Sequence, residues 1–108
     1  MRALFKRRVL RSQALRDSAK GEICTVQSPV CNHNPQTTVL AHLPDDSGIG
    51  KMGGKSDDWC AALACSACHA WLDQYADPLA RPFYVHRAML RTWRRWIELG
   101  LVTIKGVV

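Results

Sequence analysis

The sequence has no long apolar run. No stretch of its 108 residues approaches the ~20 consecutive apolar residues that a transmembrane helix needs. The first 16 residues carry six basic side chains, separated only by short apolar breaks, so we expect no signal peptide. The absence of both elements predicts a cytoplasmic protein that has no membrane partner.

Acidic side chains are scarce. Nine Asp and Glu stand against 15 Lys and Arg, which gives a net charge of +6 and a pI near 9.4. A basic chain of this kind favours an anionic partner such as a nucleic acid. The glycine-rich stretch 44–58 lacks the GxxxxGK[ST] pattern of a phosphate-binding loop. We expect this stretch to be either an exposed connector or a loop that touches DNA.

The cysteines do not suit a secreted disulfide scaffold, because their number is odd: there are five. Four of them form two close pairs, Cys24-x6-Cys31 and Cys65-x2-Cys68, with 33 residues between the pairs. This spacing predicts a site with four thiolate ligands, for which tetrahedral Zn²⁺ is the default metal. Reduced buried thiols are the alternative. We expect the fifth, Cys60, to be a core thiol.

Hydrophobic periodicity and breaker residues predict one α+β domain over residues 1–108. We expect a basic N-terminal helix or arm at 1–20, a core at 21–76 and a C-terminal helix and strand at 77–108. The basic face of the first helix could lie on phosphates or be a solvated tail. The expected elements are a helix over 2–19, strands over 37–43 and 59–64, helices over 69–76 and 82–99, and a closing strand over 101–108.

Two residues of the predicted helix after Cys68 suit a hard cation. His69 and Asp73 are four residues apart, so on a helix they point the same way and can bind one Mg²⁺ or Mn²⁺. His42, near the end of the first predicted strand, is the candidate for deprotonating an attacking water. The plainer alternatives are a helix-capping role for His69, a surface role for Asp73 and no chemical role for His42.

These motifs resemble those of the HNH, or ββα-metal, endonucleases. The resemblance rests on Ala41-His42-Leu43, on the glycine-rich loop that runs into Asp57-Asp58, and on Cys65-Ser66-Ala67-Cys68-His69. It spans about residues 15 to 75. The match is closer still to a group of short phage and prophage proteins described as nucleases of unknown substrate.

The resemblance implies a small ββα-metal core, stapled by zinc and flanked by N-terminal and C-terminal helices. It implies His42 as the general base, His69 and Asp73 as ligands of a catalytic Mg²⁺ or Mn²⁺, and Cys24, Cys31, Cys65 and Cys68 as ligands of a structural Zn²⁺. The implied function is a phage-type, metal-dependent DNA endonuclease in the cytoplasm of a bacterial host. It would act on duplex or branched DNA, and two copies could pair to cut both strands.

The sequence departs from the family pattern at two positions. Ala41 stands where many members have a metal-binding Asp or His, and Cys60 stands near the position of the usual Asn. Asp58 could replace the Asn, either as a ligand or as the group that orients His42. These departures favour an alternative function, a non-catalytic, zinc-stapled DNA-binding accessory module of phage recombination or replication. A protein-interaction adaptor is a third class, which a salt-dependent DNA-binding assay would separate from the other two.

Overall fold

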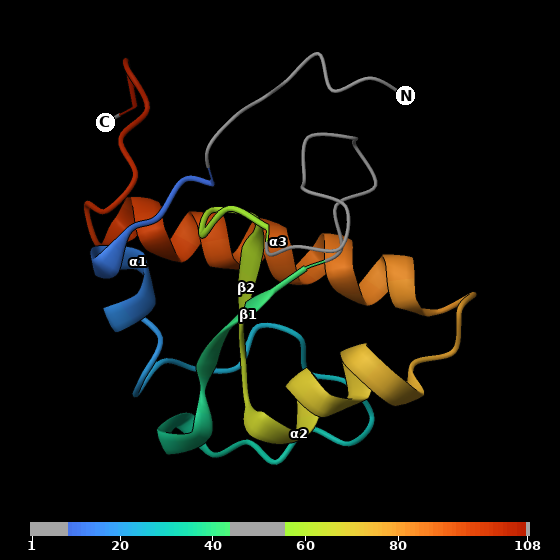
Figure 1. Cartoon of the computed structure of the whole chain (residues 1–108). Helices are drawn as coiled ribbons and strands as arrows, with labels where there is room; N and C mark the ends of the chain where they lie inside the picture. The colour runs from blue at the N-terminus through green and yellow to red at the C-terminus, as the bar shows by residue number, and fades with distance from the viewer. Residues whose placement is uncertain (1–8, 44–55, 108) are drawn as a thin grey trace.

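The computed structural model describes residues 9–43 and 56–107, which form a small mixed domain of helices around a two-stranded sheet (Figure 1). Strands β1 (Val39–His42) and β2 (Ala61–Ala64) are antiparallel, with His42 opposite Ala61 and Val39 opposite Ala64. All four residues of β2 are buried, which explains their uniformly small or apolar side chains. This sheet is the scaffold that carries His42.

Helix α2 (Ser66–Ala70) follows β2 without a connecting loop. The Cys65 sulfur accepts a hydrogen bond from the Cys68 backbone N–H and caps the helix, which therefore begins inside the C-x-x-C motif. The helix continues as a π-helical turn, η2 (Trp71–Tyr75), and ends before Asp77-Pro78. The order strand, strand, helix was expected, although the helix starts three residues earlier than predicted.

Helix α3 (Arg81–Glu98) packs against β2 and runs behind the hairpin in Figure 1. Its buried residues are Ala88, Thr92 and Trp96, one every four residues, as expected for a helix with a single core face. The helix ends at Glu98, and its C-cap Leu99 is followed by Gly100, whose φ of +76° few other residues adopt. The predicted boundaries of this helix are confirmed to within a residue.

The outer edge of β2 is closed by two threonines rather than by a third strand. The Leu63 carbonyl accepts hydrogen bonds from the N–H and the hydroxyl of Thr25, and the Leu63 N–H donates to the Thr92 hydroxyl. The prediction of a closing strand over 101–108 is therefore wrong across 101–107, which form turns and bends. The edge that such a strand would need is already occupied; Val108 lies outside the described residues.

The N-terminal helix is shorter than predicted. Helix α1 covers Gln13–Asp17, and residues 9–12 are not helical. The Ser12 hydroxyl caps α1, and the backbone of Leu10 is bonded to Asp57 and Asp58, so the preceding residues are held extended. Residues 1–8 of the predicted helix and residues 44–55 of the glycine-rich loop lie outside the described residues.

The first strand is also shorter than predicted. The residues Pro35–Thr37 form a 3₁₀ turn, η1, which the side chain of Asn34 caps. In the second strand, Trp59 and Cys60 form a turn ahead of β2. Among the helices of residues 9–43 and 56–107, none combines the length and the apolar character that a membrane crossing requires.

Candidate functional site

The two cysteine pairs come together in one cluster. The sulfur atoms of Cys24, Cys31, Cys65 and Cys68 all lie within 4.8 Å of one another. The Sγ atoms of Cys31 and Cys65 are 3.9 Å apart, too far for a disulfide and close to the edge of about 3.8 Å that a tetrahedron with Zn–S bonds near 2.3 Å requires. The fold therefore assembles the four-thiol group that the spacing predicted.

The surroundings of the cluster suit thiolates. The N–H and the hydroxyl of Ser28 lie 3.4 and 3.1 Å from the Cys68 sulfur. Burial raises the pKa of Cys65, but the backbone N–H groups of Asn32 and Cys68 outweigh it and lower that pKa to about 7. Burial and the charge of Cys24 raise the pKa of Cys68 to about 12 despite the Ser28 donors.

Burial disfavours the thiolate at both residues, N–H donors offset it at Cys65, and at Cys68 the nearby charge of Cys24 adds to it. A bound dication offsets that repulsion, and N–H donors to the sulfurs are the usual outer shell of a thiolate site. The four-sulfur donor set and its dimensions fit a closed, structural Zn²⁺ site. The four residues could together hold such a metal ion.

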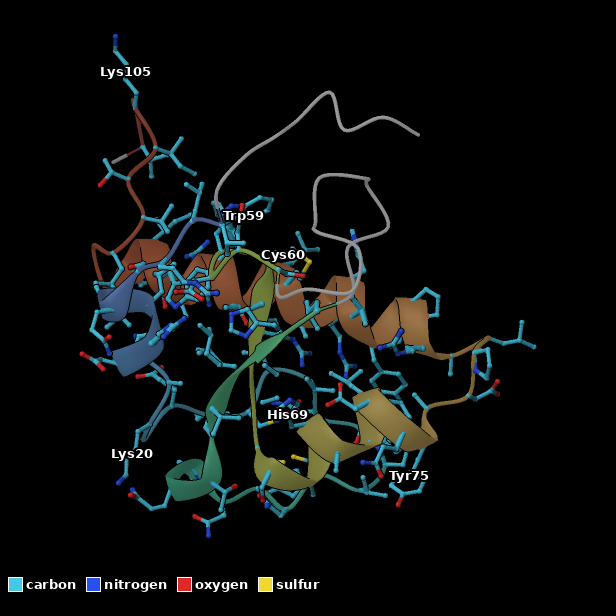
Figure 2. All side chains as sticks on the ribbon, viewed as in Figure 1. Lys20, Trp59, Cys60, His69, Tyr75 and Lys105 are labelled. Atoms are coloured by element: carbon cyan, nitrogen blue, oxygen red, sulfur yellow. The ribbon has the colours of Figure 1, made fainter. Side chains whose placement is uncertain are left out.

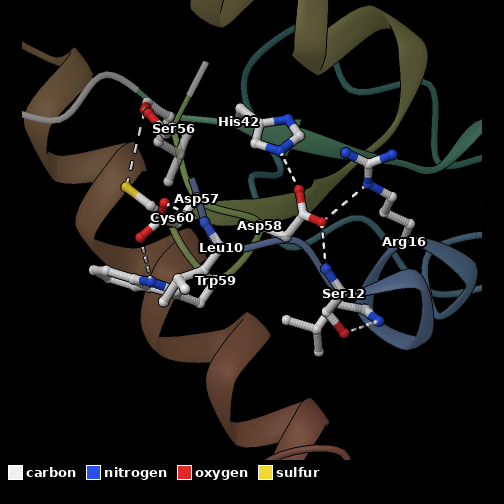
Figure 3. Close-up of polar contacts among 11 residues, drawn as sticks. Leu10, Ser12, Arg16, His42, Ser56, Asp57, Asp58, Trp59 and Cys60 are labelled. Atoms are coloured by element: carbon white, nitrogen blue, oxygen red, sulfur yellow. Dashed lines mark hydrogen bonds and ion pairs between the residues drawn. The ribbon is translucent and has the colours of Figure 1, made fainter. Parts of the chain in front are cut away.

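The second feature of the site is a pair formed by a histidine and a buried carboxylate (Figure 3). His42, the last residue of β1, places Nε2 2.8 Å from Oδ1 of Asp58. The His42 side chain is 27% exposed and that of Asp58 is 1% exposed. Ala41 points to the opposite face of the strand and is buried, so position 41 faces the core rather than the histidine.

Asp58 is surrounded by hydrogen-bond donors. Its Oδ2 accepts the Ser12 backbone N–H at 2.7 Å and the Arg16 Nε at 2.9 Å. Burial raises the pKa of Asp58, but the hydrogen bonds from Ser12, His42 and Arg16 and the charge of Arg16 outweigh this and lower it to about 2. Asp58 is thus an ionised carboxylate at neutral pH, and its position suits an orienting group for His42.

His69 and Asp73 form a separate pair on α2 and η2. His69 Nε2 and Asp73 Oδ2 are 3.4 Å apart, with side chains 40% and 54% exposed. In Figure 2, His69 lies at the opposite end of the hairpin from Cys60, which precedes β2. Within residues 9–43 and 56–107, the four thiols are the only group of three or more metal-binding side chains gathered within 4.8 Å.

Sequence reasoning missed the residues that support these groups. Neither Arg16 nor Ser12 belongs to a recognisable motif, and both are far from Asp58 in the chain. Thr92 looks like an unremarkable helix residue, yet it is fully buried and completes the edge of β2. The only sequence signal for Thr92 is that it is a polar residue among the apolar residues on the core face of α3.

Comparison with known proteins places the chain in a family. The family model described as "Putative nuclease YbcO" matches residues 13–101. The chain belongs to the YbcO family. The matched range includes all four clustered cysteines, His42, Asp58, His69 and Asp73.

Two curated YbcO proteins are similar over most of their length. The "Putative nuclease YbcO" of Escherichia coli strain K12 and the "Putative nuclease ybcO" of Enterobacteria phage 82 are each 38% identical over 92 residues. These residues are 82% of this chain and 95% of either relative. A solved structure of a "putative bacteriophage protein" from Escherichia coli K-12 MG1655 has a TM-score of 0.59 and 33% identity, covering 81% of this chain and all of that one.

Proposed function

We propose that this YbcO-family chain is a metal-dependent DNA endonuclease of the HNH type, in which His42 is the general base. Family membership supports a nuclease, that is, a hydrolase acting on nucleic acid. The order of two strands and a helix, stapled by four cysteines, supports the HNH assignment. The observation that carries the proposal is the hydrogen bond between His42 Nε2 and the ionised, buried Asp58.

This hydrogen bond selects one tautomer of the imidazole. With Asp58 as acceptor, Nε2 carries the proton and the lone pair is on Nδ1. Nδ1 then takes a proton from water as the water oxygen bonds to phosphorus and the bond to the leaving oxygen breaks. The leaving oxygen takes a proton from solvent, so the products are a phosphomonoester and an alcohol, and Asp58 stabilises the imidazolium until its own proton returns to solvent.

His69 and Asp73, which form a pair separate from His42 and Asp58, are the proposed ligands of a catalytic Mg²⁺ or Mn²⁺, and the proposal requires one phosphate to reach both pairs. Adjacent ligands of an octahedral ion of this size are about 3 Å apart, close to the 3.4 Å between His69 Nε2 and Asp73 Oδ2. Two protein ligands leave positions for water and phosphate oxygens. Such an ion, when bound, offsets the charge that develops on the phosphate and the leaving oxygen.

A second function is DNA binding without cleavage. The observation that favours it is the small ligand set: the part of the chain that the structure describes brings no third metal-binding side chain to His69 and Asp73. The net charge of +6 supports binding to phosphates under either proposal. Affinity that falls steeply with salt would be common to both, so cleavage has to decide between them.

The test is conversion of supercoiled plasmid to nicked circles by the zinc-loaded protein in Mg²⁺ or Mn²⁺. We expect nicking that stops when a chelator removes the added metal. The nick should carry a phosphate on one end and a hydroxyl on the other, which phosphate analysis and sealing by a ligase both check. The protein should remain folded and zinc-bound under the same chelator treatment, as checked by circular dichroism and metal analysis. Salt-sensitive binding without nicking in either metal would overturn the endonuclease and leave the binding module.

A further inference from the structure

The N-terminal segment Leu10–Arg16 contacts the candidate active site directly. We propose that this segment, here called the N-terminal clamp, positions Asp58 and neutralises it, so that His42 can act as a base. The inference rests on the proposed function of His42. Ser12 and Arg16 are its positioning residues, because they act through Asp58 and not on the substrate.

The two oxygens of Asp58 have different partners, as Figure 3 shows. Oδ1 faces His42 Nε2 at 2.8 Å, whereas Oδ2 is held by Ser12 N–H at 2.7 Å and Arg16 Nε at 2.9 Å. Two donors from one direction fix the rotation of the carboxylate about its side-chain bond. The clamp therefore decides where Oδ1 points, and through it the orientation of the imidazole.

The clamp is tied to the same turn by its backbone. The Leu10 N–H donates to Asp57 Oδ1 at 2.8 Å, and the Asp58 N–H donates to the Leu10 carbonyl at 2.9 Å. The other oxygen of Asp57 accepts the Trp59 indole N–H, so this second carboxylate is engaged away from His42. Four hydrogen bonds therefore join the clamp to Asp57 and Asp58, which lie about 46 positions away in sequence.

The clamp is also held in place by the packing of α1 and its hydrogen bond with α3. Leu15 of α1 and the following Ala19 are buried, and the Trp96 indole N–H of α3 donates to the Ser18 hydroxyl at 2.9 Å. Ser12 links this anchor to the site, because its hydroxyl caps α1 while its N–H holds Asp58. The position of Asp58 is therefore set by α1 and α3 as well as by its own turn.

The charge of Arg16 gives the clamp a chemical role beyond support. A buried carboxylate without a counter-charge favours the imidazolium form of its histidine partner, which has no lone pair to accept a proton. Arg16 offsets that negative charge, so the pair Asp58 and Arg16 presents His42 with a hydrogen-bond acceptor of little net charge. An Asn amide would also present His42 with a hydrogen-bond acceptor of little net charge. This explains how Asp58 can replace the Asn of the family pattern.

The test compares Arg16→Gln with Arg11→Ala, a variant that removes an equal charge from the same segment without removing a hydrogen bond to Asp58. Nitrogen NMR of the His42 ring is recorded across pH, together with the pH–rate profile of plasmid nicking. In Arg16→Gln we expect a larger share of the imidazolium form at a given pH than in the wild type, and the acid limb of the rate profile to move to higher pH. Arg11→Ala should match the wild type in the ring signal, because no hydrogen bond links the Arg11 side chain to Asp58.

A ring signal that is identical in all three proteins would overturn the clamp. Arg16→Gln could lose its zinc or its cooperative melt, and Arg16→Lys is then the test because it keeps the charge. We expect the wild-type ring signal in Arg16→Lys. A signal shifted to higher pH despite the retained charge would overturn the proposal. The NMR result does not need activity. If the wild type never nicks DNA while the ring signal still responds to Arg16, the endonuclease proposal fails and the coupling of Arg16 to His42 stands.

Discussion

At the scale of single residues, Asp58 is the group on which stability and the proposed chemistry both depend. It is 1% exposed and ionised, with a pKa lowered from 3.8 to about 2. A carboxyl with a lowered pKa in the folded state stabilises the fold above its unfolded pKa, and this contribution is lost as the pH falls through the folded value. Its effect should be complete near neutral pH, be mostly lost near pH 2 and vanish below that value.

We therefore predict that Asp58→Asn lowers the free energy of unfolding by about 2 kcal/mol at pH 6, since each pKa unit corresponds to about 1.4 kcal/mol. The difference from the wild type should shrink between about pH 4 and pH 2. Urea unfolding at several pH values measures it, and loss of zinc in acid affects both proteins alike. A difference that stays constant with pH would show that Asp58 is not ionised in the fold.

How far the site was predictable differs from residue to residue. The four cysteines could be predicted because ligand spacing is local: the first pair lies within one loop and the second at the start of α2. His42 at the end of a strand followed from the β-branched run before it. The roles of Asp58 could not be separated by spacing alone, because its partners Ser12 and Arg16 come from a segment that only the tertiary fold brings near.

At the scale of elements, α3 carries a row of arginines that ties it to the first cysteine loop. Arg87 donates to the carbonyls of Val26 and Gln27, Arg91 to the Thr25 carbonyl, and Arg95 to Glu22 at 2.6 Å. The residues at positions 87, 91 and 95 are four apart, so they lie on one face of the helix. This face supports the loop that contains Cys24 and is largely engaged within the domain.

We predict that Arg91→Ala lowers the free energy of unfolding by about 1 kcal/mol, because the Thr25 carbonyl loses a charged donor. It should also speed the loss of zinc to a chelator, since Thr25 is next to Cys24. Thermal melting and a colorimetric zinc-release assay measure the two effects. Arg94→Ala is the matched control: its side chain is 78% exposed, and equal losses in both variants would refute a special role for Arg91.

The end of α3 offers a separate prediction at this scale. The N–H groups of Gly100 and Leu101 donate to the carbonyls of Ile97 and Trp96, the pattern of a helix terminated by a left-handed residue. A Cβ at Gly100 would meet no atom within 4 Å, so only the φ of +76° opposes a side chain. Gly100→Ala should cost about 1 kcal/mol in denaturant unfolding, and a neutral result would contradict the assigned cap.

Elements with strong local signals were predicted well, and elements that depend on distant partners were not. Pro82 and Gly100 mark the ends of α3, and apolar residues at helical spacing lie between them. The prediction of a closing strand over 101–108 was wrong because Thr25 and Thr92 already form hydrogen bonds with the backbone of Leu63. The helix over 2–19 failed at residues 9–12 because the backbone of Leu10 pairs with Asp57 and Asp58, which a helical period cannot reveal.

At the scale of the whole molecule, 108 residues bury a modest core, and the four-thiol cluster joins the first cysteine loop to the start of α2. We predict that a zinc-bound form melts cooperatively and that Cys65→Ser, which removes one ligand and the cap of α2, abolishes that melt. Circular dichroism with zinc quantification tests this. Cys60→Ser, outside the cluster, is the comparison, and a native melt for Cys65→Ser without zinc would contradict a structural metal.

The central claim is that His42 takes the proton from the attacking water. The most direct measurement is the single-turnover rate of plasmid nicking by His42→Ala, beside wild type and His86→Ala, an exposed histidine on α3. All three proteins are brought to the same zinc content and checked for the same melting curve. The account predicts a loss of about 100-fold or more for His42→Ala and none for His86→Ala. A folded His42→Ala protein that nicks DNA at the wild-type rate would contradict it.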